Sequence, residues 1–202
     1  MKISIKENLP FSVFAFAVIA IFYGIYFAKM FMQKRRGIKT RQIGRVKEKS
    51  VHRVEILMGI ATLIAPFVQI FSILFGLNYM PASARFTGFC LGIIGDAIFL
   101  TSVVTMKDSW RAGIPDKDKT ELITGGIYKF SRNPAFLGFD FMYVGMLLLY
   151  FNLLTAVFSL FAMIMLHFQI LQEEKFLAST FGEEYVEYKS RVFRYLGRKN
   201  KR

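Results

Sequence analysis

The chain has 202 residues, of which 54% are hydrophobic and 16% aromatic, yet its formal net charge at pH 7 is +13. This apolar content excludes an ordinary soluble domain. The two properties are compatible when the apolar residues sit in lipid and the charges gather at its faces, so composition predicts an integral membrane protein.

Apolar runs long enough to cross a bilayer recur along the sequence. Five are present, at residues 9–28, 56–77, 86–106, 134–151 and 153–172. The last two are separated only by Asn152, so they are expected to form an antiparallel hairpin. The third contains Gly88, Gly92 and Gly95, which allow a neighbouring helix to approach closely.

The distribution of Lys and Arg predicts the orientation. Five spans place residues 33–53, 107–133 and 173–202 on one side, and these segments hold 9, 6 and 8 of the 27 Lys and Arg residues. Because basic loops remain in the cytoplasm, we expect the N-terminus outside and these three segments inside. Topology and contact with anionic lipid explain the basic loop, so nucleic acid is not an expected partner.

The last segment, residues 173–196, is amphipathic. Its larger apolar side chains recur at steps of three or four: Leu177, Phe181, Tyr185, Tyr188, Val192 and Tyr195. That period indicates a helix that lies on or near the membrane surface. The predicted fold is therefore all-α, with about five transmembrane helices and a C-terminal amphipathic cytoplasmic helix.

Two short motifs are candidate functional elements. In the first, residues 125–138, a Gly-Gly turn leads to a basic and aromatic segment, and Asn133-Pro134 then opens the fourth apolar run. Asn is a good N-cap and Pro is tolerated at the first helical position, so free N–H groups, a positive dipole end and Arg132 gather at one place. This arrangement suits a ligand with a carboxylate or a phosphate. The second motif is Glu173-Glu174, after the fifth run.

The residues of both motifs resemble a known signature. They are Ser109-Trp110-Arg111-Ala112-Gly113-Ile114, Thr120-Glu121-Leu122-Ile123, Gly126-Ile127-Tyr128 and Ser131 to Gly138, followed by Glu173-Glu174, Phe181 to Tyr185 and Tyr188. In this order and separation they resemble the isoprenylcysteine carboxyl methyltransferase family and its phospholipid methyltransferase relatives. The resemblance covers roughly residues 107–195.

The resemblance implies an integral membrane enzyme that transfers a methyl group from S-adenosylmethionine to a lipophilic acceptor. By resemblance the cofactor is lined by Thr120, Glu121, Leu122, Ile123, Tyr128, Asn133, Pro134, Ala135 and Phe136, with Glu173 at its polar end. Members of the family often carry His at the position of Asn133. Relatives that act on prenylated cysteine carry Arg at the position of Gln169.

The chemistry of the residues supports the same role. The candidate catalytic residues are Arg132, Glu173, Glu174, Gln169 and His167. Arg132 and the helix start suit the cofactor carboxylate, and Glu173 or Glu174 suits its ammonium group. A carboxylate acceptor arrives ionised and needs a cation nearby. An amine or phenol needs a general base, for which Glu174, His167 or Asp140 is available, and Gln169 in place of Arg slightly favours this second kind.

The whole chain, residues 1–202, is expected to form a single membrane domain. Residues 1–106 are a three-span scaffold, and residues 107–202 supply the cofactor-binding loop, the helical hairpin and the C-terminal helix. No metal site is expected, because no second ligand stands at metal spacing from His167. Two alternatives remain: an NADPH-dependent membrane sterol or isoprenoid reductase, and a non-catalytic membrane protein. The expected partners are the lipid bilayer and the methyl acceptor, with the oligomeric state left open.

Overall fold

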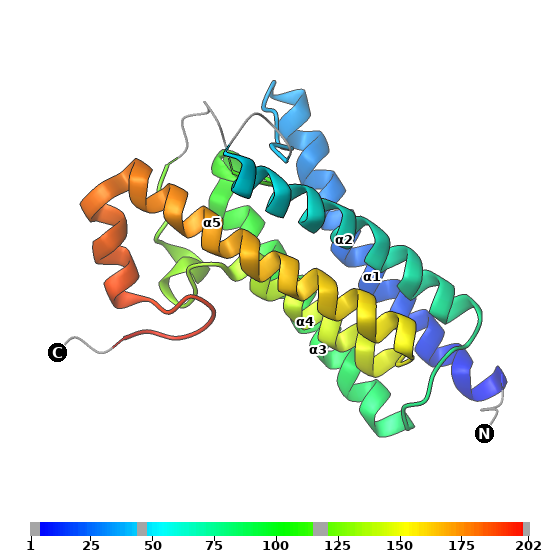
Figure 1. Ribbon diagram of the computed structural model, residues 1–202. Helices are drawn as coiled ribbons and strands as arrows, with labels where there is room; N and C mark the ends of the chain where they lie inside the picture. The colour runs from blue at the N-terminus through cyan, green and yellow to red at the C-terminus, as the bar shows by residue number, and fades with distance from the viewer. Residues whose placement is uncertain (1–4, 44–47, 115–120, 200–202) are drawn as a thin grey trace.

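The computed structural model describes residues 5–43, 48–114 and 121–199, and these residues form a bundle of helices (Figure 1). The five long helices are α1 (Ile5–Arg35), α2 (Lys49–Leu74), α3 (Ala82–Met106), α4 (Pro134–Leu149) and α5 (Leu153–Arg191). Two short 3₁₀ helices, η1 (Lys107–Ser109) and η2 (Gly126–Lys129), lie between α3 and α4. No β-strand occurs in the described ranges, and the predicted all-α class is confirmed.

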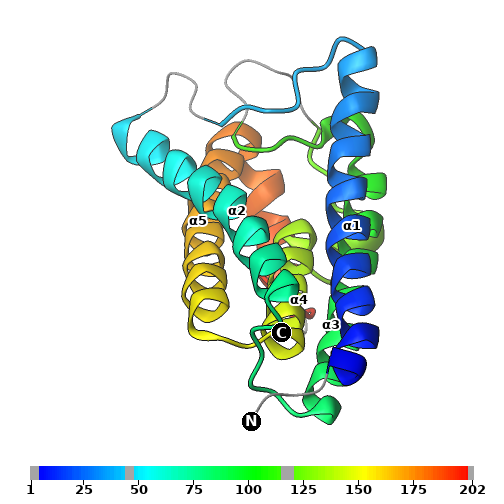
Figure 2. The ribbon, with the colours of Figure 1, turned by 90° about the vertical axis from the view of Figure 1, so that its right-hand side faces the viewer.

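The helices alternate in direction, as membrane spans do. Figure 2 shows the α1–α2 loop, the α3–α4 loop and the C-terminal part of α5 at one end of the bundle, and the α2–α3 and α4–α5 connections at the other. Helices α1, α2, α3 and α5 are long and apolar enough to cross a bilayer. The chain is therefore an integral membrane protein, and its α1–α2 and α3–α4 loops, which are rich in Lys and Arg, lie at one end of it.

Helices α3 and α4 are the most closely packed pair. A Cβ atom added to Gly95 would lie 2.7 Å from the carbonyl oxygen of Gly138, and one added to Gly145 would lie 2.6 Å from the backbone nitrogen of Gly92. Gly88 meets Gly145 in the same way. The close approach expected of the glycines in the third span is confirmed: Gly88 and Gly95 face α4, and a Cβ atom added to Gly92 would meet Val18 of α1.

Helix α4 is shorter than the other four. Its 16 residues span ~24 Å, whereas the hydrocarbon core of a bilayer is about 30 Å thick. The predicted run to Phe151 ends early, because Tyr150 leaves the helical conformation and Asn152 caps the start of α5 by accepting a hydrogen bond from the backbone N–H of Thr155. Helix α4 is surrounded by α1, α3 and α5, so its N-terminus reaches a site inside the protein.

The predicted boundary between the fifth span and the amphipathic segment is wrong. Helix α5 runs through Glu173 without a break and changes direction at Gly182, whose φ of 53° suits a residue without a Cβ atom. The segment after Gly182 folds back toward η2, as the red end of the chain shows in Figure 1. Its apolar face packs on residues 125–133, the part of the first motif that precedes α4 and is here called the motif loop. Tyr185 and Tyr188 are buried there together with Tyr128. The amphipathic pattern therefore reflects a tertiary contact, and the location of this segment at the membrane surface stays a prediction.

Substitution of Gly145 by Ala tests the α3–α4 contact. Because the added methyl group would meet backbone atoms that cannot rotate away, we expect a loss of ~1–3 kcal/mol in stability. The matched control is Gly24→Ala in α1, where nothing lies within 4 Å of the added atom. Unfolding of the purified protein in mixed micelles by increasing denaturing detergent measures both. Equal stability of the two variants would contradict this packing.

Candidate active site

The two motifs predicted from the sequence line one cavity. This motif cavity has a volume of ≈ 120 Å³ and lies between the α3–α4 connection, the start of α4 and the second half of α5. Tyr128 from the first motif and Glu173 from the second are both on its wall. Segments separated by more than forty residues therefore meet at a single site.

Most of the predicted cofactor residues lie on this wall. The structure places Glu121, Leu122, Ile123, Tyr128, Asn133, Ala135, Phe136 and Glu173 there, together with Arg132. Pro134 is the first residue of α4 and is not on the wall. Thr120 lies outside the described residues. Of the other predicted catalytic residues, Gln169, Glu174 and His167 line neither this cavity nor the larger one beside it.

Tyr128 is held between two helices. Its hydroxyl group lies 3.0 Å from Oγ of Ser102 on α3, and its carbonyl oxygen accepts a hydrogen bond of 2.7 Å from the hydroxyl group of Tyr188 on α5. Burial raises the pKa of Tyr128, so the phenol stays neutral at physiological pH. The residue therefore presents a fixed aromatic surface to the cavity.

Glu174 is the centre of a buried ionic network. Its Oε1 accepts hydrogen bonds from Arg132 Nη2 at 2.8 Å, Asn133 Nδ2 at 3.2 Å and Arg194 Nε at 3.1 Å. Its Oε2 accepts one from Arg194 Nη2 at 3.0 Å, and the hydrogen bonding to Glu174 raises the pKa of Arg194. Both carboxylate oxygens are engaged, so Glu174 holds the two motifs together and is not placed to take a proton.

One donor of Arg132, a residue that lines the motif cavity, has no partner in the network. Arg132 is buried, and its Nε has no hydrogen-bond partner among the described residues. Asn133 directs Nδ2 to Glu174 and to the carbonyl oxygen of Arg194, so its amide hydrogens are already used. A bound anion is therefore expected to contact Arg132 and the free N–H groups in the first turn of α4.

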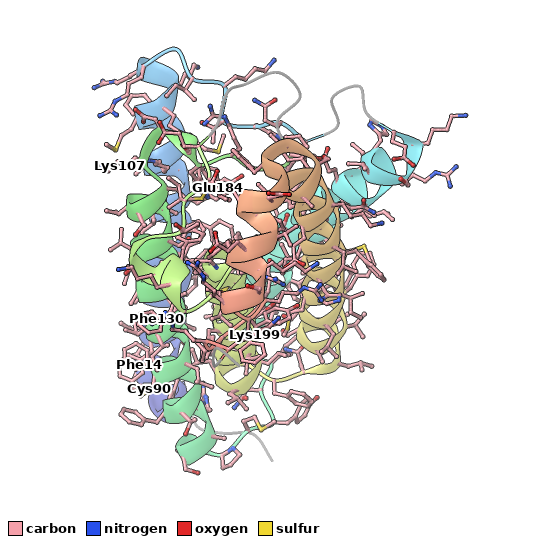
Figure 3. All side chains as sticks on the ribbon, turned by 90° about the vertical axis from the view of Figure 1, so that its left-hand side faces the viewer. Phe14, Cys90, Lys107, Phe130, Glu184 and Lys199 are labelled. Atoms are coloured by element: carbon pink, nitrogen blue, oxygen red, sulfur yellow. The ribbon has the colours of Figure 1, made fainter. Side chains whose placement is uncertain are left out.

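The residues after α5 also contact this network, through Arg194. Residues 192–199, here called the strap, pair with the motif loop through two backbone hydrogen bonds: Arg132 N–H to the carbonyl oxygen of Phe193 at 3.1 Å, and Gly197 N–H to that of Phe130 at 2.7 Å. Figure 3 labels Phe130 on the loop and Lys199 at the end of the strap. The sequence did not predict this pairing, because Asn133, Arg194 and Gly197 carry no periodic signal.

Gln169 and His167 occupy supporting positions on α5. Gln169 is buried and donates a hydrogen bond of 3.1 Å from Nε2 to Oε1 of Glu173 one turn later, so it orients a cavity residue. His167 stacks on Tyr195 of the strap, with 2.5 Å between Nδ1 and the hydroxyl oxygen. Neither side chain reaches the cavity wall.

A second, more apolar cavity of ≈ 230 Å³ adjoins the first, and here it is called the apolar cavity. The walls shared by the two cavities are formed by Trp110, Arg111, Gly113, Ala135, Phe136 and Glu173. Beyond this junction the apolar cavity extends between α1, α2, α4 and α5. Phe27 and Leu63 on its wall are 60% and 63% exposed on the outer surface of the bundle, so it opens toward lipid.

Several residues on the walls of the two cavities were not predicted as site residues from the sequence. Tyr188 was assigned to the apolar face of a surface helix, and Trp110 belonged to a motif without an assigned role. Residues of α1 and α2, such as Tyr26 and Met58, lie far from either motif in the chain. The Ser109 to Ile114 motif was the available signal, because both cavities include it.

Comparison with known proteins supports the resemblance found in the sequence. The model of the isoprenylcysteine carboxyl methyltransferase (ICMT) family matches residues 88–179. A probable protein-S-isoprenylcysteine O-methyltransferase from Oryza sativa subsp. japonica is 36% identical over 110 residues, 53% of this chain and 58% of the relative. Enzymes named protein-S-isoprenylcysteine O-methyltransferase from Saccharomyces cerevisiae and Homo sapiens are 32% and 27% identical, over 52% of this chain and 45% and 38% of their own.

The matched part is the half of the chain that carries the site. The chain spans about half the length of the curated relatives it matches. Helices α1 and α2, with the loop between them, lie outside the family match. The family resemblance is confirmed for the half of the chain that supplies the α3–α4 loop, α4 and Glu173.

The Glu174 network yields a prediction about stability. Glu174→Gln leaves Arg132 buried without its counterion, which typically costs ~3–5 kcal/mol. We expect a large fall in melting temperature and faster hydrogen exchange in the strap. Glu173→Gln, one residue away on the cavity wall, is the control and should leave both nearly unchanged. Equal melting temperatures of the two variants would show that the network has no structural role.

Proposed function

We propose, because residues 88–179 match the model of the isoprenylcysteine carboxyl methyltransferase family, that this chain is a membrane-embedded methyltransferase that uses S-adenosylmethionine. Its acceptor is a lipophilic molecule that carries a carboxylate. The observation that supports this most is the junction of the motif cavity, whose wall includes Glu121, Arg132 and Glu173, with the apolar cavity that opens toward lipid. Donor and acceptor would meet at that junction.

The motif cavity suits the chemical groups of the donor. Arg132 Nε and the first turn of α4 would receive its carboxylate, and Glu173 would receive its ammonium group. The aromatic faces of Tyr128 and Phe136 would lie against the positive sulfonium, a contact worth ~0.5–2 kcal/mol. When bound, S-adenosylmethionine supplies a methyl group made electrophilic by the adjoining sulfonium.

In this reaction the main role of the protein is to align donor and acceptor, and a reactive side chain is less important. The acceptor oxygen must approach the methyl carbon in line with the breaking carbon–sulfur bond, in a place that excludes water. Trp110, Phe136 and Ala135 form the apolar part of the junction and would provide this environment. The acceptor oxygen would take the methyl group as an ester, and the electron pair of the broken carbon–sulfur bond would stay on the sulfur of the donor.

The positions of the candidate bases favour a carboxylate acceptor over an amine or a phenol. Glu174 is saturated with hydrogen bonds, His167 stacks on Tyr195, and Asp140 lines neither cavity. A carboxylate needs no base, because it is already ionised at neutral pH. The names of the family and of the relatives specify O-methylation of isoprenylcysteine, and we extend that acceptor class to this chain.

The orientation is part of the proposal. Two of the basic segments, the α1–α2 loop and the α3–α4 loop, lie at one end of the bundle in Figure 2, and residues of the α3–α4 loop line the motif cavity. Under the positive-inside rule this end faces the cytoplasm. The donor would then enter from the water-filled side, and the acceptor would enter from the bilayer.

Binding of the donor is the first test. Isothermal titration of the purified protein in detergent should show binding of S-adenosylmethionine and of S-adenosylhomocysteine, and each should raise the melting temperature. Glu173→Gln should weaken binding of either by about tenfold or more, because a charge-assisted contact to the ammonium group is lost. Glu184→Gln, an exposed carboxylate on the same helix, is the matched control and should bind normally.

Two outcomes of that titration would count against the proposal, and a third would count against the assigned ammonium site. Heat from NADPH with none from the two adenosyl ligands would favour a reductase instead. Absence of binding for all three in a protein that remains folded would favour a non-catalytic role. Normal donor binding in Glu173→Gln would move the ammonium site elsewhere.

Access from the lipid side is the second test. Gly59 of α2 lines the apolar cavity, and an added Cβ atom there has only Ile43 within 4 Å. Gly59→Leu should therefore fill the cavity and reduce transfer of labelled methyl groups to a farnesylated cysteine acceptor by at least tenfold, with unchanged binding of S-adenosylhomocysteine. Gly24→Leu on α1, which faces open space, is the control. Full transfer activity in Gly59→Leu would place the acceptor elsewhere.

A further inference from the structure

The apolar cavity has one charged end. Most of its wall is aromatic and aliphatic, but Arg41, Arg111 and Glu173 also line it. Glu173 belongs to the shared junction and is oriented by Gln169. The two arginines are the cations that an acidic ligand in this cavity would meet.

The two arginines differ in how they are held. Arg111 Nη1 donates to the carbonyl oxygens of Asp108 and Trp110, at 2.5 and 2.9 Å, so its guanidinium group fastens its own loop. For Arg41 the structure shows no ion pair or side-chain hydrogen bond to any described residue. Arg41 is an exposed residue beside Tyr26, whose ring lines the same cavity. It is the cation available to a ligand.

The loop that carries Arg41 is fixed in place. The N–H of Ala112 donates to the carbonyl oxygen of Thr40 at 3.0 Å, and the N–H of Gln42 donates to that of Ala112 at 2.8 Å, so a parallel bridge joins Arg41 to Ala112. The buried Gln33 fastens both loops, since its Nε2 donates to the carbonyl oxygen of Trp110 and its Oε1 accepts from the hydroxyl group of Thr40. Arg41 therefore sits on backbone that is tied to the Ser109 to Ile114 motif.

A negatively charged amphiphile fits this arrangement in one direction. Its hydrocarbon part would lie between α1 and α2 against residues such as Phe27, Met58 and Leu63, where the cavity opens toward lipid. Its anionic head would point toward Arg41 and the junction. An arginine guanidinium forms two parallel hydrogen bonds to a carboxylate, and such charge-assisted bonds are stronger in an environment of low dielectric constant.

We infer that Arg41 is a specificity-determining residue that binds the carboxylate of the acceptor and positions it at the junction of the two cavities. This inference rests on the proposed function for the reaction, but its binding step can be tested without any donor. Arg41 lies in the α1–α2 loop, outside residues 88–179. On α5, the candidate position Gln169 is uncharged and is occupied with Glu173. The α1–α2 loop would therefore supply the cation.

The experiment compares a charged probe with its neutral ester. A long-chain fatty acid that carries a photoreactive diazirine, and its methyl ester, are each crosslinked to the 202-residue chain in nanodiscs of neutral lipid. Mass spectrometry then measures the label on the peptide of α2 that contains Met58 and Leu63. The variants are Arg41→Gln, which removes the charge, and Arg41→Lys, which keeps it. Lys39→Gln removes a charge from an exposed position in the same loop that lines neither cavity.

We expect Arg41→Gln to reduce labelling by the acid about tenfold and to leave labelling by the ester unchanged, since only the acid uses the charge. Arg41→Lys should retain much of the acid labelling, and Lys39→Gln should resemble the wild type. Equal acid labelling in the wild type and Arg41→Gln would overturn the inference, as would equal losses for acid and ester.

Binding of S-adenosylhomocysteine to the same samples separates this inference from the proposed function. Normal binding by Arg41→Gln also shows that the variant is folded. If the wild type bound no adenosyl ligand but still required Arg41 for acid labelling, the proposed reaction would fail while the anion site remained. If the wild type bound the adenosyl ligand but did not require Arg41 for acid labelling, the anion site would fail while the proposed reaction remained.

Discussion

The site depends on a single buried carboxylate. Glu174 lies near the end of a membrane helix, with its side chain 5% exposed, and a carboxylate in that position is strongly destabilising unless cations and hydrogen-bond donors surround it. Arg132 and Asn133 from the start of α4 and Arg194 from the strap satisfy that need. These partners come from two separate parts of the chain, so satisfying one charge fixes the start of α4 and the strap relative to α5. The shape of the motif cavity follows from this constraint.

The packing of α4 sets the depth of the site. Gly138 and Gly145 allow its backbone to contact that of α3, and the resulting helix pair has no room for larger side chains. Because α4 is also short, its N-terminus ends within the bundle and not above it. The positive end of the helix dipole and the first free N–H groups are thereby placed where water is scarce, and an anion is bound more strongly there than on a surface. The same depth places the motif cavity beside the apolar cavity. A water-soluble donor in the first and a lipid-soluble acceptor in the second would therefore contact the same wall residues.

Much of the fold could be predicted from the sequence, because membrane helices are encoded by long apolar runs and by the asymmetry of Lys and Arg. The meeting of Tyr128 and Glu173 could also be predicted, since a known signature joins them. The break at Gly182 was missed because Glu173-Glu174 marks the end of apolar character but does not interrupt helical hydrogen bonds. The strap and the docking of Arg41 beside Ala112 were missed for a different reason. They depend on backbone hydrogen bonds between irregular segments, and such bonds leave no period in the sequence.

The adjacent residues Glu173 and Glu174 illustrate why a motif does not by itself assign roles. Successive residues on a helix point about 100° apart, so two neighbouring carboxylates cannot face the same cavity equally. Here Glu174 faces the strap and is neutralised by arginine, whereas Glu173 faces the junction of the two cavities. A sequence reading treats the pair as equivalent acids, but burial and hydrogen bonding divide them into one residue that holds the site together and one that faces its contents. The same reasoning applies to Arg132 and Arg41. The first is largely occupied within the protein, and the second lies on a fixed loop at the cavity that opens toward lipid, which is the property expected of a residue that recognises a ligand.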